Sequence, residues 1–343
     1  MMTISDGSTT KHAVDWTQTV TVVMINRDGG DWLRQSLRSL RYCIEKTDHP
    51  NWTIDFVLVD NGSTDQSMAI ADVELDGASF EHRVVMEPTP GVNFARNKGL
   101  TVCRGKYVIF VDNDILFDDG WLQGYLDGFT RHREPKIFAG RVRIGKVETP
   151  APSWLDLDGP YAWTSIVVRC DNGDQDCRSA VGDPSVHGPV GPNMAFERQM
   201  LVDAGGFDTR FGLRPGSLVP GAETELFHRL AKSQHDFVYL ANASVRHPLK
   251  RNQIQKAYFL RRLEGTGRVM SRIQSDEGFQ CPRIFGVKRY LFREYVDMYA
   301  KMLAAAPGGP RRRFHARCRV AVTRGKIKED FAAYRSRPRN QHV

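Results

Sequence analysis

The stretch that most constrains the fold is residues 105–114, GKYVIFVDND. Its apolar run, residues 107–111, has the β-branched and aromatic bias of a strand buried on both faces. The run continues directly into Asp112, Asn113 and Asp114, and strand alternation turns the two carboxylates to the same side. Ligands of open α/β sheets bind beyond the carboxyl ends of the strands. The stretch therefore predicts either a divalent-cation site on two hard oxygen ligands or a solvated turn at a strand end.

Strand-like and helix-like segments alternate along residues 20–145. Strands are predicted at residues 20–25, 55–59, 83–87, 107–111 and 136–144, with helices at 31–44, after 63–66, from about 93, and around 121–129. This alternation predicts an α/β fold with a mostly parallel sheet and helices on both faces. Asp31 is expected to cap the first helix, and Ser63 to Gln66 to form a capping box for the second. A dinucleotide-binding domain is disfavoured because no GxGxxG follows the first strand.

Beyond residue 145 the pattern is less regular. Residues 148–192 are rich in Pro, Gly, Trp and Asp, which predicts a long functional or packing loop. Helices are expected at 198–204 and 222–232, with a last strand at 237–240.

Composition describes an ordinary protein of 343 residues with 41% hydrophobic and 26% charged residues. No apolar run approaches the length of a membrane span. The polar start has no apolar signal core, so residues 1–17 are expected to be a flexible tail of a cytoplasmic protein. Six scattered cysteines without a CxxC pair argue for reduced thiols, although Cys170 and Cys177 could pair if oxidised. The net charge of +8 favours anionic partners.

Carboxylates gather at predicted strand ends and helix starts. They are Asp28, Asp60, Asp112, Asp114, Glu223 and Glu225. The first four are expected to share the carboxyl edge of one sheet, where their repulsion must be offset by a cation or a cationic side chain. Arg96 is a possible partner, and the alternative for it is a weak surface ion pair.

Four sequence blocks in a fixed order resemble the family 2 glycosyltransferases of the GT-A fold. The blocks are residues 22–28, residues 57–65, residues 91–99 leading to 112–114, and residues 193–207 leading to 223–226. They contain DNGSTD, ARNKG, a DxD and GGFD, and they cover about residues 20–250. The resemblance implies transfer of a sugar from a nucleotide diphosphate donor to an acceptor.

The resemblance also implies roles for single residues. Asn26, Asp28 and Asp60 would line the pocket of the donor base, Arg96 would lie against the nucleotide, and Asp112 would reach the ribose or a metal-bound water. Asp114 would coordinate Mg²⁺ or Mn²⁺ on the diphosphate, with His247 as a further metal ligand or else a packing residue. Asn193 lies where acceptor or donor-sugar contacts fall in the family.

The expected general base is Glu223, although the family usually has Glu-Asp before Thr and this chain has Ala222-Glu223. Glu225 is the second choice, and a solvated helix face is the alternative for both. One base and a metal imply a single displacement with inversion at the anomeric carbon.

The expected division is a GT-A domain at 18–249, with a nucleotide half at 18–145 and an acceptor half at 146–249, followed by a basic helical extension at 250–343. Basic amphipathic helices either lie on anionic membranes or dock on the catalytic domain. A peripheral position on the inner face of the membrane is therefore an option.

Three functions are considered. The first is metal-dependent, inverting transfer from a UDP- or dTDP-sugar to a hydroxyl of a glycan, lipid-linked or small-molecule acceptor. The second is an inactive sugar-nucleotide-binding or membrane-surface scaffold of the same fold, motivated by Ala222. The third is a basic binder of nucleic acid or membranes, although no recognised nucleic-acid motif is present.

Overall fold

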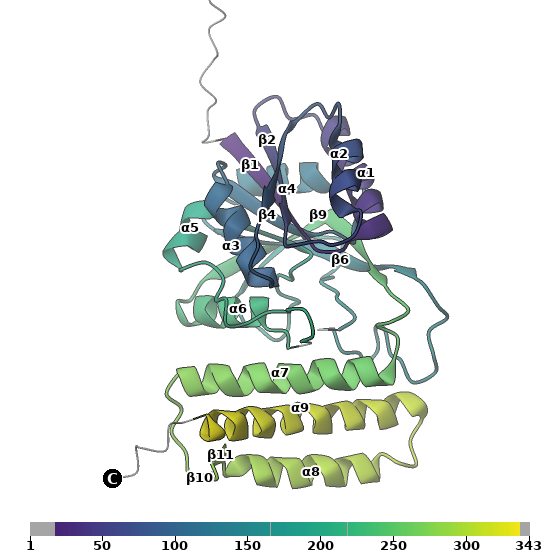
Figure 1. The fold of residues 1–343 in the computed structure, drawn as a ribbon, viewed down its shortest axis with the longest axis vertical. Helices are drawn as coiled ribbons and strands as arrows, with labels where there is room; N and C mark the ends of the chain where they lie inside the picture. Colours follow the sequence, from purple (N-terminus) through teal and green to yellow (C-terminus); the bar gives the residue numbers. More distant parts are fainter. Residues whose placement is uncertain (1–17, 165, 218, 337–343) are drawn as a thin grey trace, which may run out of the picture.

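The computed structural model describes residues 18–164, 166–217 and 219–336, so the predicted tail 1–17 lies outside the described residues. A large mixed sheet with helices on both faces forms the upper part of the molecule, and a stack of three long helices lies below it (Figure 1). The predicted α/β fold with a C-terminal helical extension is confirmed.

The first half of the sheet is parallel, as predicted. Its strands are β1 (Thr19–Asn26), β2 (Thr53–Asp60), β3 (Glu81–Met86) and β4 (Tyr107–Asp112), in the order β3-β2-β1-β4. Helices α1 (Gly30–Lys46), α2 (Ser67–Leu75) and α3 (Val92–Val102) connect them. The apolar side chains of β1, β2 and β4 are buried on both faces of the sheet. This is why the three strands appear in the sequence as unbroken apolar runs.

The second half of the sheet is mixed. It contains β5 (Leu116–Phe117), β6 (Ile137–Val147), β7 (Cys177–Ala180), β8 (Asn193–Glu197) and β9 (Asp236–Leu249), with helices α4 (Trp121–Arg131), α5 (Arg198–Asp203) and α6 (Ala222–Lys232). Strand β8 lies antiparallel between β4 and β6, while β9 is parallel to β6. Strand β9 is much longer than its predicted apolar segment, because it stays paired with β6 through two irregularities in register. This length carries His247 to the carboxyl edge.

Two predicted helix caps are wrong. Helix α1 begins at Gly30 and its N-cap is Gly29, so Asp31 lies in the first turn. Ser63 does not cap α2, because its hydroxyl bonds to the carboxylate of Asp60, and Asp65 accepts a bond from the backbone of Ser67 instead. The Ser63 hydroxyl thus joins the loop before α2 to the end of β2. Such a tertiary contact cannot be read from the local sequence.

The long segment 148–192 is mostly irregular, as predicted, and several of its apolar side chains have a packing role. Leu155, Ile166 and Val167 are buried against the extension. The ring of Trp154 contacts Phe259 and Phe314 edge-on. The segment therefore joins the sheet to the helical stack.

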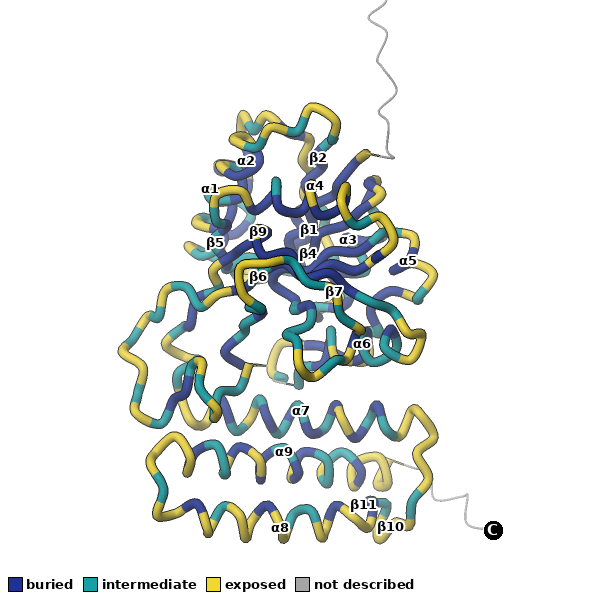
Figure 2. The backbone as a smooth tube through the Cα atoms, turned by 180° about the vertical axis from the view of Figure 1, so that it is seen from behind, coloured by how far each residue is buried: buried dark blue, intermediate teal, exposed yellow. Residues whose placement is uncertain are grey.

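The extension contains α7 (Lys256–Asp276), a short hairpin of β10 (Arg283–Ile284) and β11 (Val287–Lys288), α8 (Tyr290–Ala304) and α9 (Pro310–Arg335). Helix α7 lies nearest the sheet, α9 lies in the middle and α8 is outermost (Figures 1 and 2). No helix in the described part of the chain is both long and apolar enough to cross a bilayer.

Helices α7 and α9 approach closely, because a Cβ at Gly267 would overlap the carbonyl oxygen of Val322 and one at Gly325 would overlap that of Glu264. Beside this contact, Lys288 forms a fully enclosed ion pair with Asp330, with Nζ and Oδ1 at 2.8 Å. The hydroxyl of Ser271 donates to the same carboxylate. The hairpin is thereby tied to the helices.

We predict that Asp330→Ala lowers the free energy of unfolding by about 3 kcal/mol, because it leaves the Lys288 ammonium buried without its counter-charge. The matched control Asp297→Ala, which breaks an exposed pair with Lys301, should cost less than about 1 kcal/mol. Chemical denaturation measures both. Equal losses in the two variants would contradict a structural role for the buried pair, whereas partial recovery in Lys288→Met/Asp330→Leu would support it.

Candidate active site

A cleft of about 490 Å³ opens at the carboxyl ends of β1 and β4. Its walls come from the ends of these strands, from Asn61 after β2, from the start of α3 and from residues 213–215. The edge is the one expected for ligands of an α/β sheet. Asn26, Asp28, Asp112 and Asp114 all line it.

Three predicted metal ligands meet at this cleft. Asp112, Asp114 and His247 each offer one ligand atom, and these atoms lie within 4.8 Å of one another. The carboxylates come from the end of β4 and the turn after it, and the imidazole comes from the extended part of β9. Two carboxylate oxygens and an imidazole nitrogen form a donor set that suits Mn²⁺ or Mg²⁺.

A backbone contact fixes the tautomer of His247. Its Nδ1 lies 2.9 Å from the carbonyl oxygen of Pro248, which can only accept, so Nδ1 carries the proton. In the neutral ring, Nε2 then has a free lone pair, 3.7 Å from Oδ1 of Asp114. This outer contact orients the imidazole as a ligand.

Lys250 supplies a positive charge to the same cluster, with Nζ 2.7 Å from Oδ2 of Asp114. Burial acts to raise the pKa of Asp114, but the positive charge that His247 carries when protonated and that of Lys250 outweigh it, and the pKa is lowered. Burial raises the pKa of Asp112 to about 6, against the opposing charge of Arg96. The two carboxylates therefore differ in their affinity for a proton, because Asp114 has the nearer cations.

Arg96 connects the candidate metal ligands to the predicted base. Its Nη2 lies 2.8 Å from Oε1 of Glu223 and 3.8 Å from Oδ1 of Asp112. The guanidinium is almost fully buried, and its Nε and Nη1 have no hydrogen-bond partner among the described residues. Gly191 lies against the pair, since a Cβ there would overlap both Glu223 and Arg96.

Glu223 is held as a carboxylate. Burial acts to raise its pKa, but the charge of Arg96 is the main opposing effect and the pKa is lowered. Arg262 of α7 contributes to this lowering, and its Nη1 is buried without a hydrogen-bond partner in the part of the chain that the structure describes. Glu223 thus presents an ionised oxygen that Arg96 links to Asp112, one of the three candidate metal ligands.

The wall of the cleft beside β1 and β2 has two layers. Asp60 is fully enclosed and accepts bonds from the backbone and hydroxyl of Ser63 and from Nδ2 of Asn26. Asp28 accepts a bond from the backbone of Thr64 at 2.7 Å. Asp60 therefore lies behind Asn26 and Ser63, whereas Asp28 lines the cleft itself.

Asn193 and Glu225 are not brought to the cleft. Asn193 is fully buried in the sheet, where it accepts from Trp121 and Tyr125 and donates to the backbone of Arg141 and Ala243. Glu225 faces away from Glu223 and forms an ion pair with Arg229. Their hydrogen-bonding capacity is used in joining structural elements, so neither is available to a ligand in this arrangement.

Lys250, Arg262 and Arg214 were not predicted as site residues. Lys250 and Arg262 stand in the basic stretch that reads as a separate extension, and Arg214 lies in a Pro/Gly-rich loop that lines the cleft. The spacing of Lys250, shortly after His247 at a strand end, is the only signal that could have found it. The expected boundary at residue 249 cuts through this cluster.

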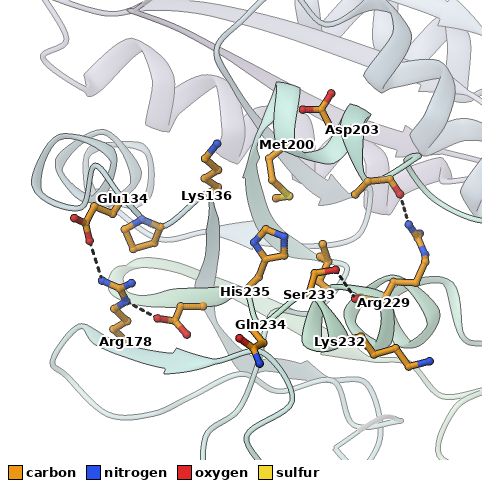
Figure 3. Close-up of a pocket in the computed structure, with 14 residues that line it drawn as sticks. Glu134, Lys136, Arg178, Met200, Asp203, Arg229, Lys232, Ser233, Gln234 and His235 are labelled. Carbon is orange, nitrogen blue, oxygen red and sulfur yellow. Dashed lines mark hydrogen bonds and ion pairs between the residues drawn. The ribbon is translucent and has the colours of Figure 1, made fainter.

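A cavity of about 800 Å³ lies elsewhere, near the starts of β6 and β9 and beside α5 and α6 (Figure 3). Arg178 there pairs with Glu134 and Asp236, and Arg229 donates to the backbone of Ala204. Its charged groups thus have protein partners, and it lies at the opposite edge of the sheet from Asp112. The smaller cleft at the carboxyl edge is the better candidate, because three carboxylates that are clustered there, those of Asp28, Asp112 and Asp114, line it.

Comparison with known proteins identifies the family of the chain. Residues 19–201 match the family described as glycosyl transferase family 2. The chain is 28% identical over 162 residues to the putative teichuronic acid biosynthesis glycosyltransferase TuaG of Bacillus subtilis, covering 46% of this chain and 61% of that protein. It is 27% identical over 248 residues to the pre-mycofactocin glycosyltransferase of Mycobacterium tuberculosis, covering 67% and 48%. The match thus spans less than two thirds of each relative.

Solved structures show the same fold at low identity. Residues 1–349 of Staphylococcus aureus TarS, in complex with UDP-GlcNAc, align with a TM-score of 0.51 at 13% identity over 92% of both chains. The mannosyltransferase PcManGT of Pyrobaculum calidifontis, in complex with GDP-Man and Mn²⁺, aligns with a TM-score of 0.55 at 15% identity, over 90% of this chain and 86% of that one. With the family match covering more than half of its length, the chain belongs to glycosyl transferase family 2 and has the GT-A fold.

Proposed function

We propose that this glycosyltransferase catalyses metal-dependent, inverting transfer of a sugar from a UDP- or dTDP-sugar to a hydroxyl group. The observation that carries the proposal is the meeting of Asp112, Asp114 and His247 with the Glu223–Arg96 pair at one edge of the sheet. A candidate cation-binding set then lies beside an ionised carboxylate, to which Arg96 links it.

Asp112, Asp114 and His247 would hold Mg²⁺ or Mn²⁺. Bound there, the ion supplies Lewis-acid stabilisation of the diphosphate leaving group. Lys250 stays within reach of Asp114 and adds a second positive charge on the leaving-group side. The donor set of the three residues supports this assignment, as does the Mn²⁺ named with PcManGT.

Glu223 would take the proton of the acceptor hydroxyl as that oxygen attacks the anomeric carbon. Arg96 contacts Oε1 of Glu223 and leaves Oε2 for the acceptor. Because this pair keeps the carboxylate ionised, the base is ready near neutral pH. In a single displacement the acceptor oxygen, deprotonated by Glu223, would bond to the anomeric carbon on the face opposite the departing diphosphate, and the configuration would be inverted.

The nucleobase of the donor would lie against Asn26, Asp28 and Asn61. Asp60 would act from behind this wall by holding Asn26 and Ser63, and it would accept directly from an imide N–H only if Ser63 turned aside. An imide N–H favours uridine or thymidine over guanosine. The acceptor is proposed to be a glycan, a lipid-linked glycan or a small molecule.

An inactive scaffold of the same fold is the second candidate, because Ala222 replaces the first acid of the family's usual pair. The ionised Glu223 beside the metal ligands favours an active enzyme instead. Product formation by the wild-type protein separates the two.

We predict that Mn²⁺ and UDP together raise the melting temperature more than either alone, because the ion and the diphosphate bind as a unit. Saturation at about 100 times Kd corresponds to about 2.7 kcal/mol. Asp114→Asn should remove the Mn²⁺-dependent part of the shift. Asp119→Asn, an exposed change with a Lys46 partner, should leave it intact. A shift independent of Mn²⁺ in the wild type would contradict the metal site.

We predict that Glu223→Gln lowers kcat by about 10²–10⁴ while UDP affinity stays unchanged, since only proton transfer is lost. The control is Glu225→Gln, which perturbs the Arg229 pair and should lower stability rather than kcat. Transfer is followed by release of UDP, and the anomeric configuration of the product is read by NMR. A retained configuration would rule out single displacement, and a larger kcat loss in Glu225→Gln would reassign the base.

We predict that UDP binds more tightly than GDP, and that Asp60→Asn weakens UDP binding by at least about tenfold because it loosens both Ser63 and Asn26. Asp65→Asn in the same loop is the control, because the carboxylate of Asp65 accepts its hydrogen bond from the backbone at the start of α2. Calorimetric titration measures the affinities of the wild type for UDP and for GDP, and the affinity of each variant for UDP. Preference for GDP, or equal effects of the two substitutions, would overturn the assignment of the nucleobase pocket.

A further inference from the structure

The charge of the chain is divided sharply between its two parts. Residues 250–343 contain 23 Lys and Arg against 7 Asp and Glu, which is a formal +16. Since the whole chain carries +8, residues 1–249 carry −8. A positive potential is therefore concentrated on the helical stack, away from the acidic sheet domain.

Four large apolar side chains lie in a row on α8, the outermost helix of this stack. Phe292 is 41% exposed, Val296 68%, Tyr299 46% and Leu303 59%. Their spacing of four, three and four residues places them on one stripe of the helix. Single exposed apolar residues are common, but a continuous row on an outer helix marks an interaction surface.

The stripe and a basic row share one edge of the stack. The other edge of the stack is marked by Lys326 of α9 and Glu294 of α8, whose side chains pair at 2.9 Å. At about 100° per residue, the stripe lies across α8 from Glu294. By the same rotation, the side chains that lie across α9 from Lys326 are Arg313, Arg317, Arg324 and Lys328. The apolar stripe of α8 and the basic row of α9 therefore both lie at the edge opposite the Lys326–Glu294 pair. We call it the apolar-basic edge.

Cations border the stripe on its other side as well, because Arg289 and Arg293 follow it around α8. Arg324 and Lys328 share the carboxylate of Glu264. Within the described ranges, no ion pair within 4.0 Å joins Arg289, Arg293, Arg313 or Arg317 to a carboxylate, although all four residues are exposed. These guanidiniums are available to an external anion.

We propose that the apolar-basic edge docks the enzyme on an anionic phospholipid surface. The stripe would enter the headgroup region, and the flanking arginines would contact lipid phosphates. A second copy of the chain is a poorer occupant, because it would bring two extensions of +16 together. This docking would favour a lipid-linked or membrane-associated acceptor. Only that part of the inference rests on the proposed function.

The experiment is co-sedimentation of the full chain with vesicles. Wild type should bind vesicles of phosphatidylcholine mixed with phosphatidylglycerol, bind phosphatidylcholine alone weakly, and be released by salt. Val296→Glu/Leu303→Glu should lower the partition coefficient by at least about tenfold. The matched control Val73→Glu/Val202→Glu places the same charges at exposed apolar positions of the sheet domain and should bind as wild type does.

Arg313→Gln/Arg317→Gln is a second variant and should weaken binding and reduce its salt dependence. Equal binding by Val296→Glu/Leu303→Glu and its control would overturn the proposal. So would a wild-type dimer in light scattering that this variant dissolves, which would assign the edge to a second copy. The UDP- and Mn²⁺-dependent thermal shift of each variant is measured in parallel, so that loss of docking is distinguished from failure of the proposed function.

Discussion

The site depends on a buried guanidinium. Carboxylates gathered at one edge of a sheet repel one another and lose hydration, so they are stable only beside positive charge. Arg96 supplies that charge from inside the protein, where it contacts both Glu223 and Asp112. One side chain of α3 thereby joins the general-base candidate of α6 to the metal-ligand candidates of β4.

A second set of cations reaches the same edge from the chain beyond the sheet. Strand β9 continues far past its apolar part, brings His247 to Asp114, and is followed by Lys250. Helix α7 then passes close enough for the charge of Arg262 to act on Glu223. The extension is thus electrostatically part of the site, although its sequence looks like a separate basic appendage.

Much of the site could be predicted because its residues follow apolar strands directly. Asp112 and Asp114 were expected at a strand end, and Asp60 and Asp28 at neighbouring ends, because parallel strands place their carboxyl ends at one edge. The burial of Asp60 behind Ser63 could not be predicted, since it depends on how a loop folds back onto β1. The enclosure of Asn193 by Trp121 and Tyr125 depends likewise on the packing of α4 against the sheet.

The sequence by itself determined the alternation of strands and helices, the carboxylate edge and the family, because these are written in local apolar patterns and in short motifs with fixed spacing. Only the tertiary structure decided which of two nearby acids lies beside the carboxylates of the sheet edge. Arg96 links Glu223 to Asp112, whereas Glu225 pairs with Arg229. Successive helical positions two apart point in different directions, and the partner that each carboxylate meets comes from distant parts of the chain. It also placed the apolar stripe of α8 beside the basic row of α9, since that neighbourhood depends on how two antiparallel helices are rotated against each other.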